Sequence, residues 1–285
     1  MDNSQTRQNI LLVRRAAMFS PNMQNADAAI LEAVGDQLVA QGHDVRFVDE
    51  TALDLAFFQS QPPFQTVFTM GRNESTLTLL LQIQQATPGL RIVNHPQAVR
   101  LCSRHLFSQR LQRFMPPTLI VDLTNPDQLR LATSLQLPCW VKRGEGYAEC
   151  ADDVAFASTS DEILQALRRL QQRGQHVAVV QQHVEGDLVK FYGVTATNYH
   201  QWYYACEGHS KFGLEEYNGP HHAYPFAHTL LEAKSQMAAS LLGLDVYGGD
   251  AIVTPDGEVY LIDLNDWPSF SRFRQEAARE IARII

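Results

Sequence analysis

The sequence predicts an α/β domain followed by an α+β domain. Three observations support this fold class. Short apolar strands alternate with helices over the first hundred residues, the pattern changes after the proline-containing break at 114–118, and the chain closes with a β-hairpin. Strands separated by helices indicate a parallel, doubly wound sheet, whereas strands joined by tight turns indicate antiparallel pairing. A chain of 285 residues has room for two or three such units.

The first unit, residues 1–98, is expected to contain the parallel sheet. Strands are expected at 10–13, 45–48, 66–70 and 91–93, and helices around 30–42 and 77–83. Ligands of parallel sheets bind beyond the carboxyl ends of the strands. Arg14 and Arg15 follow the first strand there, and Arg72 follows the third. These arginines can hold an anionic substrate, or they can be ordinary solvated loop residues.

The second unit, residues 99–285, has more strands and fewer crossover helices. A helix over about 97–112 precedes the break. Strands are expected at 118–122, 139–142, 154–159, 177–184, 188–196 and 201–207, with helices at 126–136, 161–170 and 230–243. The last two strands are joined by TPDG at 254–257, which has the proline and glycine positions of a type I turn. A terminal helix follows, and a long polar loop fills 208–228.

The composition excludes several classes of protein. Hydrophobic residues make up 45% and charged residues 19%, as in soluble globular proteins. The net charge of −8 gives no general basic surface for nucleic acid. We find no run of 18 apolar residues and no apolar leader, so neither a membrane span nor a signal peptide is expected, and the predicted location is the cytoplasm. The four cysteines lack metal-ligand spacing and are expected to be small buried thiols.

Asp250, Asp263 and Asn265 form the first candidate site. Counting outward from the TPDG turn places Asp250 opposite residue 262 or 263. Asp263 and Asn265 lie two apart and so share one face of their strand. Two carboxylates and an amide are hard oxygen donors that suit Mg²⁺, and two close carboxylates need a cation or a shared proton. The alternative is a pair of solvated strand-end acids.

Lys142 forms the second candidate site, at the end of the apolar strand CWVK. The stem of a lysine in such a place can be buried while its ammonium reaches a cleft. Gly144 and Gly146 follow at once and can let backbone N–H groups approach an anion. The segment is therefore a candidate phosphate clamp, and an ordinary turn is the alternative.

The third candidate site is the strand VAVVQQHV with the acidic turn after it. Backbone groups at 182–184 can read the edge of a purine, and Glu185 or Asp187 can hold ribose hydroxyls. Lys190 lies three residues further on, in the next strand. A plain β-turn at 185–187 is the alternative.

The order of these three sites closely resembles the ATP-grasp superfamily. The likeness covers about 99–285, and residues 1–98 resemble the domain that precedes the ATP-grasp fold in such enzymes. The resemblance implies that ATP lies between two β-sheets, with a central lid subdomain at about 118–184 and a C-terminal subdomain at about 185–285.

The resemblance also assigns roles to residues. Lys142 would contact the ATP phosphates. Adenine would be contacted by Gln182, His183 and Val184, and the ribose by Glu185 or Asp187. Lys190 would also be a nucleotide contact, and Mg²⁺ would be held by Asp250, Asp263 and Asn265. Such enzymes usually carry another phosphate-binding lysine on the helix before the break, and here Arg104 or His105 takes its place. Arginine suits that role, whereas histidine suits it poorly at pH 7.

The activity implied is that of the RimK-like ligases, which activate a carboxylate as an acylphosphate for attack by an amine. Lys142 and Arg272 are the expected catalytic cations, and the expected substrate contacts are Arg14, Arg72, Lys211 and Arg274. Trp267, Pro268 and Phe270 also resemble the inositol trisphosphate kinases of this fold, which phosphorylate a hydroxyl. A catalytically inactive nucleotide-binding protein is a third possibility.

We favour the ligase because a polyphosphate acceptor demands concentrated positive charge, and this chain is acidic. A small molecule or a peptide is the expected substrate, and a homodimer is possible because dimers are common in the family. A zinc site at His209, His221, His222 and His228 is disfavoured, since adjacent histidines point apart in extended chain and no ligand spacing fits.

Overall fold

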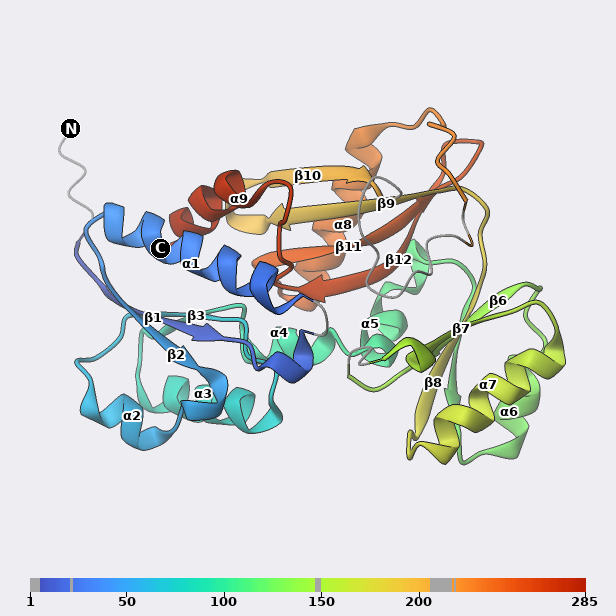
Figure 1. Ribbon diagram of the computed structural model, residues 1–285, viewed down its shortest axis with the longest axis horizontal. Coiled ribbons are helices and arrows are strands. Elements are labelled where there is room, and N and C mark those ends of the chain that lie inside the picture. Colours follow the sequence, from blue (N-terminus) through green and yellow to red (C-terminus); the bar gives the residue numbers. More distant parts are fainter. Residues whose placement is uncertain (1–5, 21–22, 147–149, 206–216, 218) are drawn as a thin grey trace.

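A computed structural model describes residues 6–20, 23–146, 150–205, 217 and 219–285. In this part of the chain three four-stranded sheets lie one after another along the sequence. Sheet A is at the lower left of Figure 1, sheet C at the top, and sheet B at the lower right. Lys211 and His209 lie outside the described residues.

Sheet A is parallel, with the strand order β2-β1-β3-β4. It comprises β1 (Asn9–Arg14), β2 (Asp44–Asp49), β3 (Thr66–Thr69) and β4 (Arg91–Val93). The helices of this unit are α1 (Gln24–Ala40), α2 (Leu55–Ser60), α3 (Glu74–Ala86) and α4 (Pro96–Leu101). The parallel arrangement confirms the prediction for the first unit. A parallel sheet is buried on both faces, so its strands are continuously apolar, as β1 is.

Sheet B is antiparallel, with the order β5-β8-β6-β7. It comprises β5 (Thr118–Asp122), β6 (Cys139–Arg143), β7 (Val154–Ala157) and β8 (Val177–Gln182), and it packs against α6 (Pro126–Ala132) and α7 (Ser160–Gln172). The strand expected at 154–159 ends early because Thr159 caps α7. The Thr159 hydroxyl accepts from the Glu162 N–H, and the Glu162 carboxylate accepts from the Thr159 N–H.

Sheet C is also antiparallel, with the order β10-β9-β11-β12. It comprises β9 (Asp187–Val194), β10 (Tyr199–Tyr204), β11 (Val246–Val253) and β12 (Val259–Asp266). Two helices, α5 (Arg104–Leu111) and α8 (His228–Leu242), supply the apolar side chains of one core with it. The turn before β12 closes with a hydrogen bond from the Gly257 N–H to the Thr254 carbonyl, as the type I pattern predicts.

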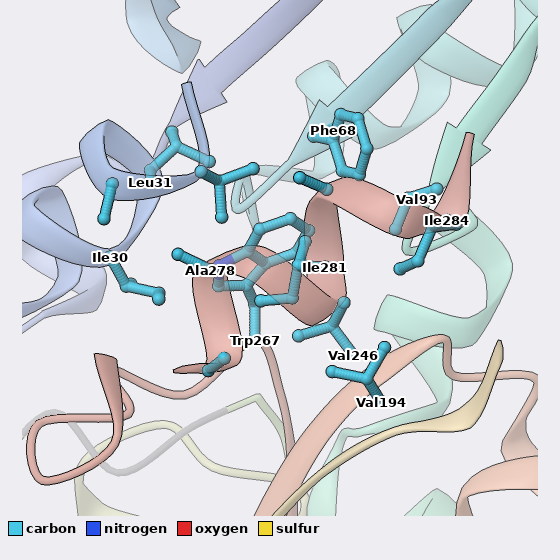
Figure 2. Packing of buried hydrophobic residues seen from close by; sticks show 14 of the residues in the cluster. Ile30, Leu31, Phe68, Val93, Val194, Val246, Trp267, Ala278, Ile281 and Ile284 are labelled. Atoms are coloured by element: carbon cyan, nitrogen blue, oxygen red, sulfur yellow. The ribbon is translucent and has the colours of Figure 1, made fainter. Parts of the chain in front are cut away.

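The terminal helix α9 (Arg274–Ile281) returns to sheet A and packs against α1. Figure 2 shows Trp267 at the centre of the apolar cluster that results. The cluster joins Ile30 and Leu31 of α1, Phe68 of sheet A and Ile281 of α9. Sheets A and C therefore share a core, which fixes the carboxyl end of β12 against the loops of sheet A.

The helix expected over about 97–112 is instead two helices. Cys102 and Ser103 separate α4 from α5, and Ser103 has an extended backbone. The His105 N–H bonds to the Gly144 carbonyl at 3.0 Å, and the Ser103 hydroxyl bonds to the same carbonyl. The start of α5 thus joins the loop after β6. The single-helix prediction was wrong because this partner lies about 40 residues away in sequence.

Candidate functional site

A cavity of about 370 Å³ lies where the three sheets meet. Its walls come from β6 and β8 of sheet B, from β9, β11 and β12 of sheet C, and from the loops that follow β1 and β3. Of the predicted site residues, those that line it are Arg72, Arg104, Lys142, Gln182, His183, Val184, Lys190, Asp250, Asp263 and Asn265. The fold therefore brings together the three segments that the sequence places 40 or more residues apart.

Asp250 and Asp263 face each other across the β11–β12 hairpin. They are register partners, and the next pair toward the turn is Ala251 with Leu261. Ile262 is thus one extra residue on β12, which is a β-bulge. The bulge resolves the alternatives that counting from the turn left open, and it keeps Asp263 on the cavity side together with Asn265.

Cations surround this acidic pair. Lys190 Nζ lies 3.1 Å from a carboxylate oxygen of Asp250, and the Arg104 guanidinium lies 3.7 Å from a carboxylate oxygen of Asp263. Both carboxyl groups remain partly exposed to the cavity. Among the described residues no three His, Cys, Asp or Glu side chains form a metal-binding group, so a cation here would rely on two carboxylates and the Asn265 amide. This all-oxygen set fits Mg²⁺, which usually keeps several waters.

Lys142 is buried between sheets B and C, with 8% of its surface exposed. Its ammonium donates to the Gln181 side-chain oxygen at 2.8 Å and to the Ile262 carbonyl at 3.2 Å. Burial and then the positive charge of Arg104 lower the pKa of Lys142 to about 8, while the nearby acids oppose the shift. The ammonium therefore gains strongly from any anion that enters the cavity.

Arg104, rather than His105, reaches the cavity from the start of α5. The Arg104 guanidinium donates to the Arg143 carbonyl, and its buried Nε has no hydrogen-bond partner among the described atoms. The His105 ring instead bonds to the Gly144 carbonyl at 2.8 Å. An unpartnered buried guanidinium donor beside Lys142 fits an anionic ligand.

The glycine loop after β6 is held by its neighbours. The Gly144 N–H donates to the Val177 carbonyl, and the Gly146 N–H donates to the Ser103 hydroxyl. Gly144 has no room for a side chain, because a Cβ there would lie 2.7 Å from the Val177 oxygen. The rest of the loop, 147–149, lies outside the described residues, so binding of an anion by the loop stays a prediction.

The segment after β8 is anchored on both sides. The Gln182 N–H bonds to the Pro117 carbonyl, and the His183 N–H bonds to the Pro138 carbonyl. The Trp140 indole donates to the His183 ring at 3.1 Å, and burial lowers the pKa of His183. The segment thus presents a rigid backbone edge to the cavity.

Asp187 and Glu185 do not line the cavity. Asp187 is buried, and its carboxylate accepts from the His222 N–H at 2.6 Å and from the Tyr224 N–H at 2.8 Å. Both of its oxygens are therefore used to hold the segment at 222–224. Glu185 is exposed beside it. A ribose contact by either acid stays a prediction.

The predicted substrate arginines lie in different places. Arg72 lines the cavity, but its guanidinium is paired with Asp266, which is fully buried. Arg14 packs over Phe47 and Arg272 over Tyr203, and neither reaches the cavity wall; nor does Arg274. Their roles as substrate or catalytic residues stay predictions.

Asp266 is a charged residue of the site that the sequence analysis did not predict. Asp266 binds Arg15 as well as Arg72, and Arg15 also binds Asp27 at 3.1 Å. Asp266 follows Asn265 directly and is fully buried. Its partners are 194 and 251 residues away in sequence, so no local pattern indicates this network.

Comparison with solved structures gives matches over nearly the whole chain. D-alanyl-alanine synthetase A from Vibrio cholerae matches with a TM-score of 0.65 and 13% identity, over 96% of this chain and 93% of that one. An ATP-grasp RimK domain protein from Sphaerobacter thermophilus matches with a TM-score of 0.66 and 17% identity, over 97% and 99%. D-alanine–D-alanine ligase from Bacillus anthracis, complexed with ATP, matches with a TM-score of 0.68 and 12% identity, over 97% and 96%.

These matches define the class: the chain has the ATP-grasp fold. The fold class predicted from the sequence is confirmed, including the α/β unit that precedes the ATP-grasp fold. No protein-family model matches the chain. No curated protein matches it either. Among the described residues, none of the helices is long and apolar enough to span a membrane.

Proposed function

We propose that this protein is an Mg-ATP-dependent ligase that activates a carboxylate as an acylphosphate, which an amine then attacks. One observation carries the proposal. Lys142 and Arg104 face Asp250, Asp263 and Asn265 in one cavity, beside the backbone edge at 182–184. A nucleotide is bound by cations that contact its phosphates, by oxygen ligands that hold its metal ion and by a backbone edge that contacts its base. The ligases among the similar structures support the same reaction class.

Each residue would have a defined task. The Val184 N–H and the carbonyls near it would bind the adenine edge, because this segment lines the cavity and is anchored on both sides. Lys142 and Arg104 would bind phosphate oxygens and offset the negative charge that shifts during transfer. Lys142 is 8% exposed, and a buried setting strengthens these contacts because the local dielectric constant is lower than that of water.

Asp250, Asp263 and Asn265 would hold Mg²⁺, which when bound neutralises phosphate charge and aligns the transferred group. Lys190 would hold Asp250 in place through its 3.1 Å ion pair. Asp263 would be held by Arg104 and by its own hydrogen bond from the Leu264 N–H at 3.1 Å. The chain therefore supplies positioning and charge, and it needs no nucleophilic serine or cysteine.

The charge of the cavity favours a ligase over a kinase for polyphosphates. Among the described residues, the cations lining it are Arg15, Arg72, Arg104, Lys142 and Lys190, and the carboxylates are Asp27, Asp250, Asp263 and Asp266. Five cations nearly balanced by four acids give little surplus for an acceptor that carries several phosphates. A carboxylate with one negative charge fits this balance better.

A trapping assay tests the proposal. The protein is incubated with Mg-ATP, hydroxylamine and a panel of small carboxylic acids and peptides, because hydroxylamine converts an acylphosphate to a stable hydroxamate. A hydroxamate formed together with ADP and free phosphate supports the ligase. ADP with phosphate retained on a hydroxyl acceptor supports the kinase instead. Nucleotide binding without turnover on any acceptor class would support the inactive protein.

A further inference from the structure

A buried glutamine holds the Lys142 ammonium. Gln181 is 1% exposed and lies on β8, next to β6 in sheet B. Its side-chain oxygen accepts from Lys142 Nζ at 2.8 Å, and its side-chain nitrogen donates to the Thr118 hydroxyl at 3.2 Å. Thr118 is the register partner of Gln181 on β5. Three neighbouring strands thus contribute one row of hydrogen-bonded side chains.

The hydrogen bonds of this row have a fixed direction. The Thr118 hydroxyl donates to the Pro116 carbonyl at 2.7 Å, so its hydrogen is used and its oxygen can only accept from Gln181. The amide nitrogen of Gln181 must therefore face Thr118, and the amide oxygen must face Lys142. The reversed amide would point an N–H group at the ammonium and is excluded by that repulsion.

The second acceptor of Lys142 is the Ile262 carbonyl, at 3.2 Å. Ile262 is the bulged residue of β12, and the extra residue of a bulge is left out of the ladder pairing. An ammonium has three hydrogens, so two fixed bonds leave one for a ligand in the cavity. A free lysine loses rotamer entropy when it is immobilised, and a lysine fixed in advance avoids this cost on binding.

We propose that Gln181, oriented by Thr118, is a positioning residue that holds the Lys142 ammonium ready for the phosphates of the nucleotide. This inference rests on the proposed function, because it states how the main cation of that site is held. The rival explanation is that Gln181 only satisfies a buried lysine. In that case Gln181 contributes to folding and leaves nucleotide affinity unchanged.

Three variants separate the two explanations. Gln181→Met removes both hydrogen bonds at similar volume. Thr118→Val removes the group that orients the amide. The matched control is Gln128→Met, since Gln128 also serves sheet B by accepting from the Asp122 N–H at 2.7 Å and does not line the cavity.

Calorimetric titration with Mg²⁺ and a non-hydrolysable ATP analogue, well below each unfolding midpoint, gives the readout. We expect Gln181→Met to raise Kd at least about tenfold, and Thr118→Val to raise it about threefold. Gln128→Met should stay close to the wild type. Equal Kd for Gln181→Met and wild type overturns the inference. If Gln181→Met does not fold, equal Kd for Thr118→Val and wild type overturns it.

A crystal structure of Gln181→Met without nucleotide separates failure of this inference from failure of the proposed function. If wild type itself binds no nucleotide, the proposed function fails. The positioning role is then decided by the structure alone. Displacement of Lys142 Nζ from the Ile262 carbonyl supports the role, and an unmoved Nζ overturns it.

Discussion

Lys142 and Ile262 are 120 residues apart in sequence, and the ammonium of one donates to the carbonyl of the other at 3.2 Å. This contact joins sheet B to the hairpin that carries Asp250 and Asp263. The β-bulge at Ile262 makes the contact possible, because it frees a carbonyl next to the acidic pair. The phosphate-binding and metal-binding parts of the proposed site are therefore mechanically connected.

The first prediction concerns the acidic pair. Asp263→Asn keeps the shape of the side chain but removes the charge that a metal needs. We expect the wild type to gain about 2.7 kcal/mol of unfolding free energy when Mg-ATP is present at a hundred times its Kd, and the variant to gain almost none. Thermal unfolding with and without Mg-ATP measures this gain. Asp256→Asn, on the turn of the same hairpin, should respond like the wild type; an equal gain in Asp263→Asn would exclude the residue as a metal ligand.

The second prediction follows from the lowered pKa of Lys142. In the folded protein this pKa is about 8, below the ordinary value of 10.5. Between these values the unfolded chain holds more protons, so the unfolding free energy should rise with pH. The penalty for burying the charged lysine is present below pH 8 and is relieved above it, by up to about 3 kcal/mol.

Urea unfolding of the wild type and of Lys142→Met, at pH 7.5 and pH 10 without nucleotide or magnesium, measures this contribution. Only the difference between the two proteins counts, because other groups titrate in both. The stability of the wild type relative to Lys142→Met should increase with pH. A difference that is constant or that falls with pH would show that the ammonium is not penalised by burial.

The third prediction concerns Asp266, which joins the loops of sheet A to the end of β12. Asp266→Asn leaves two buried guanidinium groups without their shared carboxylate, and such losses cost about 3–5 kcal/mol. Chemical denaturation measures the loss. Asp44→Asn breaks the exposed ion pair with Arg7 and should have a much smaller effect. A loss below about 1 kcal/mol in Asp266→Asn would contradict the structural role of the network.

The fourth prediction separates the two acids after β8. Asp187→Asn replaces an acceptor with an N–H group that opposes a backbone N–H, so we expect a loss of about 1–3 kcal/mol in stability. Its Kd for Mg-ATP should change little. Glu185→Gln should leave stability unchanged, and a weaker affinity there would identify Glu185 as the ribose contact. A large rise in Kd for a well-folded Asp187→Asn protein would instead restore Asp187 to that role.

Turn type and strand pattern, which are set by residues close together in sequence, predicted part of the site. The TPDG turn fixes the pairing of β11 with β12, so Asp250 and Asp263 could be placed together from sequence. Lys142 could be singled out because it ends an apolar strand. The three segments could be assembled because their order resembles a known superfamily, and in the structure residues of all three line one cavity.

Contacts between distant segments set the features that were not predicted. The break between α4 and α5 depends on the Gly144 carbonyl, which is about 40 residues away. The roles of Asp266 and Gln181 depend on partners in other strands or another sheet, and a single buried amide or acid has no periodic signature. The sequence alone therefore predicts the residues that would contact a ligand better than it predicts the residues that hold those side chains in position.

The central claim is that ATP activates a carboxylate here, and isotope transfer tests it most directly. A carboxylic acid that yields a hydroxamate in the trapping assay is labelled with ¹⁸O in its carboxyl group and turned over with Mg-ATP and an amine. In the acylphosphate one carboxyl oxygen bridges carbon and phosphorus, and the amine displaces it as part of the phosphate, so ¹⁸O should appear in the released inorganic phosphate. Turnover that releases phosphate without ¹⁸O, or that leaves the phosphoryl group on a hydroxyl, would contradict the account.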